Sequence, residues 1–388
     1  MKELNNIIAA FAKIQHNNEQ VFLATVVNAQ GSTYRQPGAR MLITSTGKMV
    51  GTISGGCLEN DVFEHTRVSM PDGKPIVVTY DTTADEDIIW GFGLGCNGVI
   101  KVLIEPLNQD NPLNPLAFIH QCFENQQQGI IATVIAVEGR VNVKVGARLI
   151  LQSNNTVNTD IKDEYLTAAL LKDAQAALEN QHSSFHQYQL AVGKVDIFIE
   201  LIKPPPHLII FGAGRDSVPV AEFAKALGWR VTIVDCRGSE VTQERFIMAD
   251  QVILTRREIL DKQICIDDDT IAVVMTHNYL DDLEILKVLI PAPISYLGCL
   301  GSKQRTARLL QDLRAAGVEC TPIQLEKLYT PVGIDIGADT PEAIALSIIA
   351  EIQAVLANRG GGFLKHRMEP IHKRNQVNKI PIKNYKGC

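Results

Sequence analysis

Two cysteines in glycine-rich turns are the side chains of this sequence best suited to chemistry. Cys57 ends the run Ser54-Gly55-Gly56-Cys57, and Cys96 directly follows Gly95 in a similar turn. Glycine adopts positive φ and has no Cβ, so consecutive N–H groups can surround an anion. Two such thiols would suit a soft metal or sulfur chemistry beside an anionic ligand. Each also has an ordinary alternative, because free cysteines are often buried and a Gly-Gly pair can mark a simple turn.

The residues around Cys57 predict elements that would hold this turn in place. A helix is predicted over 58–64, and a helix N-terminus favours a thiolate over a thiol. Apolar residues at helical spacing predict another helix over 4–14. Short β-prone runs predict strands at 21–27, 41–44, 49–53, 76–80 and 99–104. We therefore expect an α+β region whose turns, rather than its strands, carry the chemistry.

An internal repeat follows this region. Ala24-Thr25-Val26 recurs as Ala132-Thr133-Val134, and Gly38-Ala39-Arg40 recurs as Gly146-Ala147-Arg148, each at a spacing of 108 residues. The second copy has neither cysteine turn, and its alternating valines at 141, 143 and 145 predict a strand. We infer that the first copy retains a site and the second contributes core. Because both arginines recur where the cysteines do not, both could be structural.

A Rossmann-type domain is predicted after the proline linker 204–206. The buried-strand run 207–211 enters Gly212-Ala213-Gly214-Arg215, a helical segment follows, and the strand 231–235 ends at Asp235, where a ribose-binding acid would lie. Ser217 occupies the third glycine position, so a Rossmann fold without a dinucleotide stays an open alternative. Arg215 at the helix mouth would favour a phosphate-bearing ligand. Further strands are predicted at 251–254, 271–275 and 294–297.

Three later loops follow strands of this domain, at the edge where open α/β sheets bind ligands. His277 is a candidate ligand or acid–base contact, although a histidine of a surface loop is the ordinary alternative. Gly301-Ser302-Lys303 could cradle a phosphate. Asp335 and Asp339 precede a helix that Thr340 is expected to cap.

Length and composition limit the class of protein. The 388 residues suit several domains, which we place at 1–106, 107–203, 204–358 and a basic, flexible tail at 359–388. The chain lacks an apolar run of membrane-spanning length and a secretory signal, so a cytoplasmic protein without a membrane partner is expected. Its eight scattered cysteines are not a disulfide framework. Sparse aromatic residues and the absence of a clustered basic helix argue against a nucleic-acid partner.

Several motifs in a fixed order resemble the XdhC/CoxI family. They are Gly31-Ser32-Thr33-Tyr34-Arg35, Pro37-Gly38-Ala39-Arg40-Met41 and the two cysteine turns, with 331–338 and 340–345 resembling a second signature. The resemblance implies an α/β protein with an N-terminal XdhC/CoxI-type domain, a degenerate repeat and a C-terminal Rossmann-type parallel sheet. Arg215 stands where the family usually has histidine, and Cys236 where it has an acid.

The same resemblance implies an accessory protein rather than a stand-alone catalyst. Such a protein binds molybdenum cofactor (molybdopterin), assists its sulfuration and inserts it into a xanthine dehydrogenase-type molybdenum hydroxylase. Cys57 would be the metal or sulfur contact, Cys96 its partner or a pocket thiol, and Arg35 and Arg40 anion contacts. The implied partners are the hydroxylase, a cysteine desulfurase and further copies of the chain.

Two other functions remain open. One is an NAD(P)-dependent oxidoreductase, or binder of another nucleotide, that uses Gly212-Ala213-Gly214 and Asp235. The other is a thiol-based sulfur-transfer or redox enzyme that uses Cys57 and Cys96 as a pair. The pair could form a disulfide only if its Cα atoms lie within about 7 Å.

Overall fold

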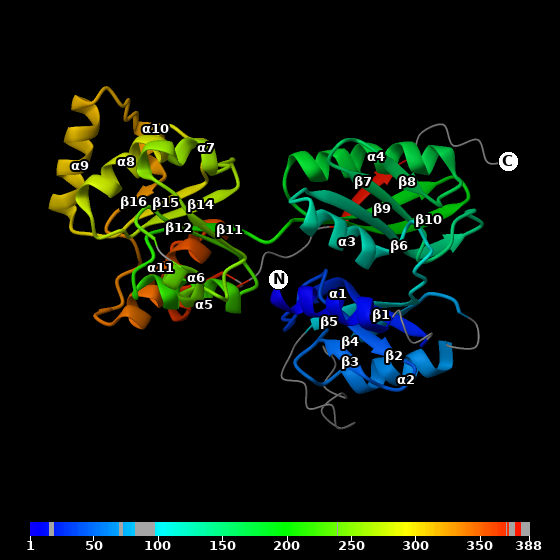
Figure 1. The fold of residues 1–388 in the computed structure, drawn as a ribbon. Helices are drawn as coiled ribbons and strands as arrows, with labels where there is room; N and C mark the ends of the chain where they lie inside the picture. The colour runs from blue at the N-terminus through cyan, green and yellow to red at the C-terminus, as the bar shows by residue number, and fades with distance from the viewer. Residues whose placement is uncertain are drawn as a thin grey trace. The chain divides into compact units, whose positions relative to one another are not determined.

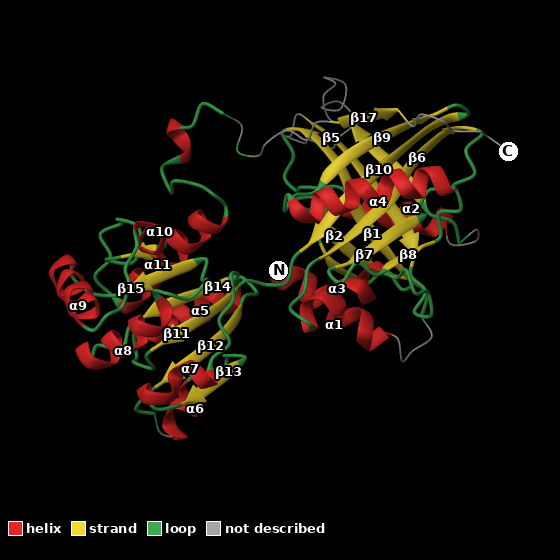
Figure 2. Ribbon diagram, turned by 90° about the horizontal axis from the view of Figure 1, so that it is seen from above, coloured by secondary structure: helices red, strands yellow, loops and turns green. Residues whose placement is uncertain are grey.

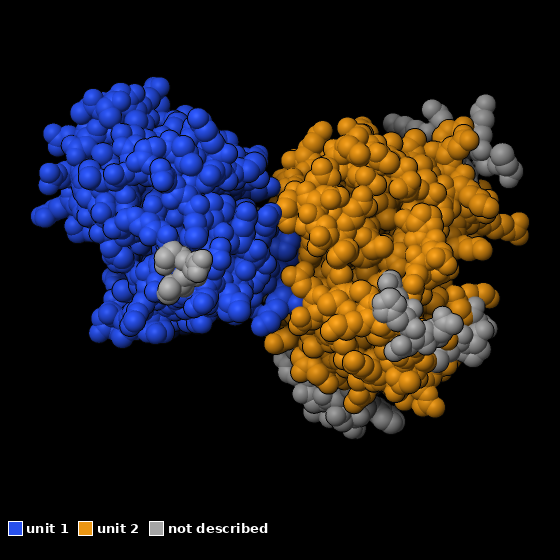
Figure 3. All heavy atoms as spheres, viewed as in Figure 1, with its two compact units in different colours: residues 1–2, 205–371 blue, residues 3–204, 372–388 orange. Residues whose placement is uncertain are grey.

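The structure is a computed structural model that describes residues 1–14, 19–69, 73–81, 98–238, 240–369, 371 and 377–381. The chain divides into two compact units, which Figure 3 colours separately. We call residues 3–204 and 372–388 the repeat unit, and residues 1–2 and 205–371 the Rossmann unit. Both units combine helices and sheets, so the predicted α/β class is confirmed.

The first sheet of the repeat unit has the strand order β3-β2-β1-β5-β4, and all its pairings are antiparallel. Two helices accompany it, α1 (Lys2–Ile14) and α2 (Glu59–Ser69). Its strands are β1 (Val21–Gly31), β2 (Arg40–Thr44), β3 (Met49–Gly51), β4 (Ile76–Asp81) and β5 (Gly98–Pro106).

The second sheet repeats this arrangement, with the order β17-β9-β10-β6-β7-β8. Its helices are α3 (Pro115–Glu124) and α4 (Glu164–Glu179). The edge strand β17 (Val377–Pro381) comes from the predicted tail and pairs in parallel with β9. The other strands are β6 (Gly129–Gly139), β7 (Arg148–Gln152), β8 (Val157–Thr159), β9 (Ser184–Leu190) and β10 (Gly193–Ile202).

The two sheets match in detail. The bounds of β6, β7 and β8 are those of β1, β2 and β3 shifted by 108 residues. Both long strands carry a bulge at the equivalent residue, Val27 in β1 and Ile135 in β6. The predicted strand at 141–145 is wrong, because this stretch forms a loop that leads into a turn at Gly146, where φ is +84°. The equivalent stretch of the first copy, 33–37, is also a loop.

The repeat unit is built in layers. Core residues of α1 and α3 pack between the two sheets, where Ile7, Phe11, Ile119 and Phe123 belong to one buried apolar cluster. On the outer faces, α2 covers the first sheet and α4 covers the second (Figure 1). Burial of these apolar faces is the main stabilising contribution in such a layered unit.

The Rossmann unit contains a parallel sheet with the order β13-β12-β11-β14-β15-β16. Core residues of α5 and α11 cover one face, and those of α7, α8 and α9 cover the other. Figure 2 shows the strands of this sheet lying side by side with the helices around them. The strands are β11 (His207–Phe211), β12 (Arg230–Asp235), β13 (Gln251–Leu254), β14 (Thr270–Val274), β15 (Tyr296–Cys299) and β16 (Leu328–Tyr329). The helices are α5 (Ser217–Ala226), α6 (Glu240–Arg245), α7 (Leu260–Gln263), α8 (Tyr279–Leu289), α9 (Lys303–Ala315), α10 (Pro322–Glu326) and α11 (Pro341–Leu356), with 3-10 turns at Arg257–Ile259 and Leu364–His366.

This strand order confirms the predicted Rossmann-type sheet. The chain leaves β11 toward β12 on one side and returns to β14 on the other, so the sheet has a switch point between β11 and β14. Open α/β sheets bind ligands in the crevice at such a point. Among the described helices, none is both long enough and apolar enough to cross a membrane.

Candidate functional site

The turn that carries Cys57 is organised by the buried side chain of Ser54. Its Oγ accepts hydrogen bonds from the N–H groups of Gly56 at 3.2 Å, Cys57 at 3.1 Å and Leu58 at 3.1 Å. The same hydroxyl donates to Oε2 of Glu59 at 2.5 Å. One hydroxyl therefore fixes the backbone of the whole turn between β3 and α2.

The Glu59 carboxylate completes this network. It accepts the N–H groups of Ile53 at 3.1 Å and Ser54 at 2.9 Å, and it also accepts that of Leu58. Burial alone would raise the pKa of Glu59, but the hydrogen bonds from Ser54 and the backbone outweigh it and hold the pKa below its usual value. The ionised carboxylate of Glu59 therefore accepts hydrogen bonds from backbone N–H groups of the turn that were predicted to bind an external anion.

What the turn leaves open is the Cys57 thiol. Cys57 is exposed and free, and its Sγ lies 3.6 Å from the Ser54 Oγ. Gly56 has φ +105°, and among the described residues other than its chain neighbours Gly55 and Cys57, no atom lies within 4 Å of where its Cβ would be. A ligand can therefore approach the sulfur over bare backbone. Gly95 and Cys96 lie outside the described residues, so their predicted role stays a prediction.

The loop between β1 and β2 packs against this turn. The ring of Tyr34 lies 3.7 Å from the position that a Cβ on Gly55 would occupy, yet Tyr34 is 69% exposed. Arg35 forms an ion pair with Glu3, whose other oxygen accepts the N–H of Thr52 at 2.7 Å. Arg35 therefore lies beside the turn, as an anion contact would require. Tyr34 is not among the predicted site residues, although an aromatic side chain between Gly31 and Pro37 is a signal that could have identified it.

Arg40 occupies a different environment. Its guanidinium is 4% exposed and makes a two-pronged contact with Glu200, at 2.8 Å to Oε1 and 2.5 Å to Oε2. This geometry favours the structural alternative for Arg40 over an anion contact. In the part of the chain that the structure describes, no three His, Cys, Asp or Glu side chains gather as metal ligands.

In the Rossmann unit, the glycine turn after β11 has the predicted form. Gly212 has φ +118°, and a Cβ there would lie 2.5 Å from the carbonyl oxygen of Met275. Only glycine fits this close approach. Ser217, at the third glycine position, is fully buried and donates its hydroxyl to the Gly212 carbonyl at 2.8 Å. Serine at the position of the third glycine therefore adds a hydrogen bond that closes the turn, rather than disrupting it.

His277 and Asp216 meet at the switch point. His277 Nε2 lies 2.6 Å from Asp216 Oδ2, next to Gly214, and the His277 backbone is left-handed with φ +57°. The imidazole is 60% exposed. Arg215 is exposed, and its guanidinium has no hydrogen-bond or ion-pair partner among the described residues. Asp216, the residue that contacts His277, is not among the predicted site residues.

Asp235 lies at the end of β12, as predicted, but part of its carboxylate is already engaged. Oδ1 accepts the N–H of Arg237 at 3.0 Å, and Oδ2 accepts the hydroxyl of Thr242 at 2.9 Å. Burial, with the nearby Asp281 and Asp235, raises the pKa of the neighbouring Cys236 thiol to about 11. Cys236 is therefore a poor nucleophile at neutral pH.

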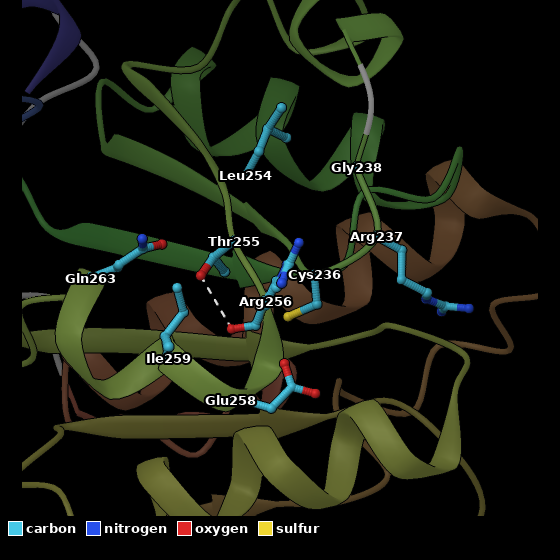
Figure 4. Close-up of a pocket in the computed structure, with 9 residues that line it drawn as sticks. All are labelled: Cys236, Arg237, Gly238, Leu254, Thr255, Arg256, Glu258, Ile259 and Gln263. Atoms are coloured by element: carbon cyan, nitrogen blue, oxygen red, sulfur yellow. Dashed lines mark hydrogen bonds between the residues drawn. The ribbon is translucent and has the colours of Figure 1, made fainter.

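An open pocket of about 810 Å³ follows β12 and β13 (Figure 4). Its cationic side chains are Arg237 and Arg256, and Leu254 and Ile259 supply apolar surface. Arg237 also forms an ion pair with Asp281 at 2.8 Å and donates to the Thr276 carbonyl at 3.3 Å. One arginine thus joins the loops after β12 and β14, a link that sequence analysis did not foresee.

The remaining predicted residues lie in loops along the same edge of the sheet. Gly301 and Lys303 follow β15, and between them Ser302 caps α9 by accepting the Arg305 N–H at 3.2 Å. Lys303 is exposed. Asp335 and Asp339 are exposed in the segment before α11, which Thr340 caps as predicted.

Comparison with known proteins places the chain among relatives. The model of the XdhC and CoxI family matches residues 14–81 and 122–189, once in each repeat, and that of the XdhC Rossmann domain matches 208–352. The chain is 32% identical over 350 residues to a protein of Bacillus subtilis described as a probable xanthine dehydrogenase subunit, covering 90% of this chain and 97% of that one. It is 22% identical over 334 residues to the molybdenum cofactor insertion chaperone PaoD of Escherichia coli, covering 86% and 82%.

A solved structure has the same fold. A crystal structure described as a xanthine dehydrogenase from Bacillus halodurans matches with a TM-score of 0.73 and 28% identity, covering 91% of this chain and 96% of that one. The matches extend through both repeats and the Rossmann unit, in the order that the motifs predict. The chain belongs to the XdhC and CoxI family.

Proposed function

We propose that this protein binds molybdenum cofactor and assists its insertion into a molybdenum hydroxylase of the xanthine dehydrogenase type. The observation that carries the proposal is the exposed Cys57 thiol on a turn that Ser54 and Glu59 hold in place. A thiol is a suitable contact for molybdenum or for a transferred sulfur. The relatives described as a xanthine dehydrogenase subunit and a cofactor insertion chaperone support the same role.

The surroundings of Cys57 suit a planar, anionic cargo. Tyr34 presents an exposed ring on which a pterin could stack, and Arg35 supplies positive charge nearby. Because Ser54 and Glu59 occupy most amides of the turn, we assign the phosphate of the cargo to Arg35 rather than to the backbone. Sulfuration, with a cysteine desulfurase as donor, and assembly into a homo-oligomer are finer parts of this proposal.

The test is native mass spectrometry with molybdenum analysis after co-expression with the cofactor pathway. The wild-type chain is expected to carry the mass of molybdopterin and molybdenum, and Cys57→Ala to lose both. Cys265→Ala is the matched control, because Cys265 is also an exposed free cysteine but belongs to the Rossmann unit. Equal cofactor content in wild type and Cys57→Ala would refute the role of Cys57.

A second candidate function is nucleotide binding at the Rossmann crevice, with an NAD(P)-dependent reaction as one form of it. The His277–Asp216 pair, the free Arg215 and the pocket beside Asp235 favour it. Calorimetric titration with NAD, NADP and ATP tests this candidate, and Arg215→Ala should weaken any binding that is found. A sulfur-transfer or redox enzyme that pairs Cys57 with Cys96 is a third candidate, which disulfide mapping by mass spectrometry would test.

A further inference from the structure

Two buried ion pairs join the repeats, and each pair links an arginine of one copy to a glutamate of the other. Arg40 on β2 of the first repeat contacts Glu200 on β10 of the second. Arg148 on β7 of the second repeat contacts Glu105 on β5 of the first, at 2.5 Å. All four side chains are at most 10% exposed. Each repeat therefore supplies the carboxylate that neutralises the buried arginine of the other repeat.

The two pairs differ in the backbone that they hold. Nη1 of Arg40 also donates to the carbonyl oxygen of Gly38 at 2.8 Å, in the loop between β1 and β2. Nη1 of Arg148 instead donates to the carbonyl oxygen of Leu113 at 3.1 Å, just before α3. The Glu200 pair is thus tied to the loop that meets the Cys57 turn, whereas the Glu105 pair is tied to the connection between the repeats.

Glu200 also lies directly against this loop. Gly38 has φ +94°, and a Cβ there would come within 2.8 Å of Glu200 Oε1. The same loop carries Tyr34, which packs on Gly55, and Arg35, which is linked through Glu3 to Thr52. A continuous set of contacts therefore leads from Glu200 to the turn of Cys57.

We propose that Glu200 is a positioning residue for the Cys57 site, so that the second repeat, which has no cysteine turn, holds the ligand-facing loop of the first. A two-pronged arginine–carboxylate contact fixes orientation as well as distance. Breaking such a buried pair leaves an uncompensated charge, so the loop would lose its single conformation. A loop fixed beforehand lowers the ordering cost of binding. The inference rests on the proposed function for the identity of the ligand, but not for the loop itself.

Glu200→Gln and Glu105→Gln are matched variants that test this inference in the full-length chain. Hydrogen exchange without cofactor is measured on peptides covering 31–39 and 108–114. Glu200→Gln is expected to speed exchange in 31–39 at least tenfold and to leave 108–114 unchanged, and Glu105→Gln to do the reverse. Cofactor affinity, measured by anaerobic ultrafiltration with molybdenum analysis, should fall about tenfold in Glu200→Gln and less than twofold in Glu105→Gln.

A second pair of variants covers the case in which Glu200→Gln does not fold. Gly38→Ala pushes a methyl group toward Glu200, and Gly146→Ala is its equivalent in the second repeat, where the methyl group would meet Pro75. Only Gly38→Ala should speed exchange in 31–39 and change the rate at which iodoacetamide alkylates Cys57. Unchanged exchange in 31–39, or equal loss of affinity in both members of a pair, would overturn the inference. A wild-type chain that binds no cofactor would refute the proposed function instead, while exchange and alkylation still decide the role of Glu200.

Discussion

Replacement of Ser54 by alanine should loosen the Cys57 turn by a predictable amount. The Ser54 hydroxyl donates to an ionised carboxylate at 2.5 Å and accepts three backbone N–H groups. Gly56 and Cys57 are exposed, so water can replace the hydroxyl at their N–H groups. The bond to Glu59 is buried, and a hydrogen bond to a charged group contributes about 1.5–3 kcal/mol. A loss of about 2 kcal/mol corresponds to a roughly 30-fold change in the equilibrium for opening the turn.

Native-state hydrogen exchange of a peptide covering 52–58 measures this opening directly. Ser54→Ala should exchange roughly 30-fold faster than wild type, because exchange follows the opening equilibrium. Ser45→Ala is the control, because Ser45 is exposed at a hairpin turn and its hydroxyl makes only a 3.5 Å contact with Glu19. If Ser54→Ala and Ser45→Ala exchange at the same rate in this peptide, the network does not organise the turn.

The same network makes the turn sensitive to acid. The pKa of Glu59 is lower in the folded turn than the ordinary value of 4.5. Its stabilisation is therefore complete above pH 4.5 and is lost as the pH falls through the lowered pKa. Ser54→Ala removes one hydrogen bond that lowers this pKa, so protection of 52–58 should be lost at a higher pH than in wild type. Identical pH profiles for the two proteins would contradict this assignment.

Three further experiments address the described thiols, His207 and the cap of α11. Iodoacetamide at pH 8 should label the exposed thiols of Cys57 and Cys265 before those of Cys236 and Cys299. The reason is that burial raises the pKa of Cys236 to about 11 and that of Cys299 to about 12. Peptide mass spectrometry would record the order of labelling. Burial and Arg230 lower the pKa of His207 to about 4, so the Rossmann unit should lose stability as the pH falls from 6.5 toward 4. Urea titrations should show a smaller loss of unfolding free energy over this pH range in His207→Asn than in wild type. Thr340→Ala should remove the cap of α11 and lower the stability of the Rossmann unit by about 1 kcal/mol, with no change in exchange at 52–58.

Much of the fold could be predicted because its signals are local. The strand 207–211, the glycine turn after it and the strand that ends at Asp235 follow from short apolar runs and one motif. The repeat was visible because its arginines and glycines keep a constant spacing of 108 residues. The loop at 141–145 was predicted wrongly, because alternating valines fit a strand until the turn at Gly146 interrupts them.

The site was harder to predict because its contacts join distant parts of the chain. Asp216 and His277 are 61 residues apart, and Arg40 and Glu200 are 160 apart. Glu105 and Glu200 each follow three apolar residues in their own copy, but each pairs with the arginine of the other copy, which no spacing reveals. The role of Glu59 is different: it lies close to Ser54, but its contacts with the amides depend on the shape of the turn.

The hydrogen bonds that the turn makes to its own backbone N–H groups affect how a carrier would release its ligand. If the amides near Cys57 were open, a phosphorylated ligand could gain several charge-assisted hydrogen bonds and dissociate slowly. Ser54 and Glu59 take up those amides instead, and the negative charge of Glu59 disfavours a second anion among them. Among the described residues, the remaining contacts of the proposed site are one thiol, one exposed ring and one arginine already paired with Glu3. Such a site would orient the cofactor through few interactions, so a client enzyme with more contacts could remove it. Glu59→Gln removes the negative charge that disfavours a bound anion, so this variant should release the cofactor to the hydroxylase more slowly.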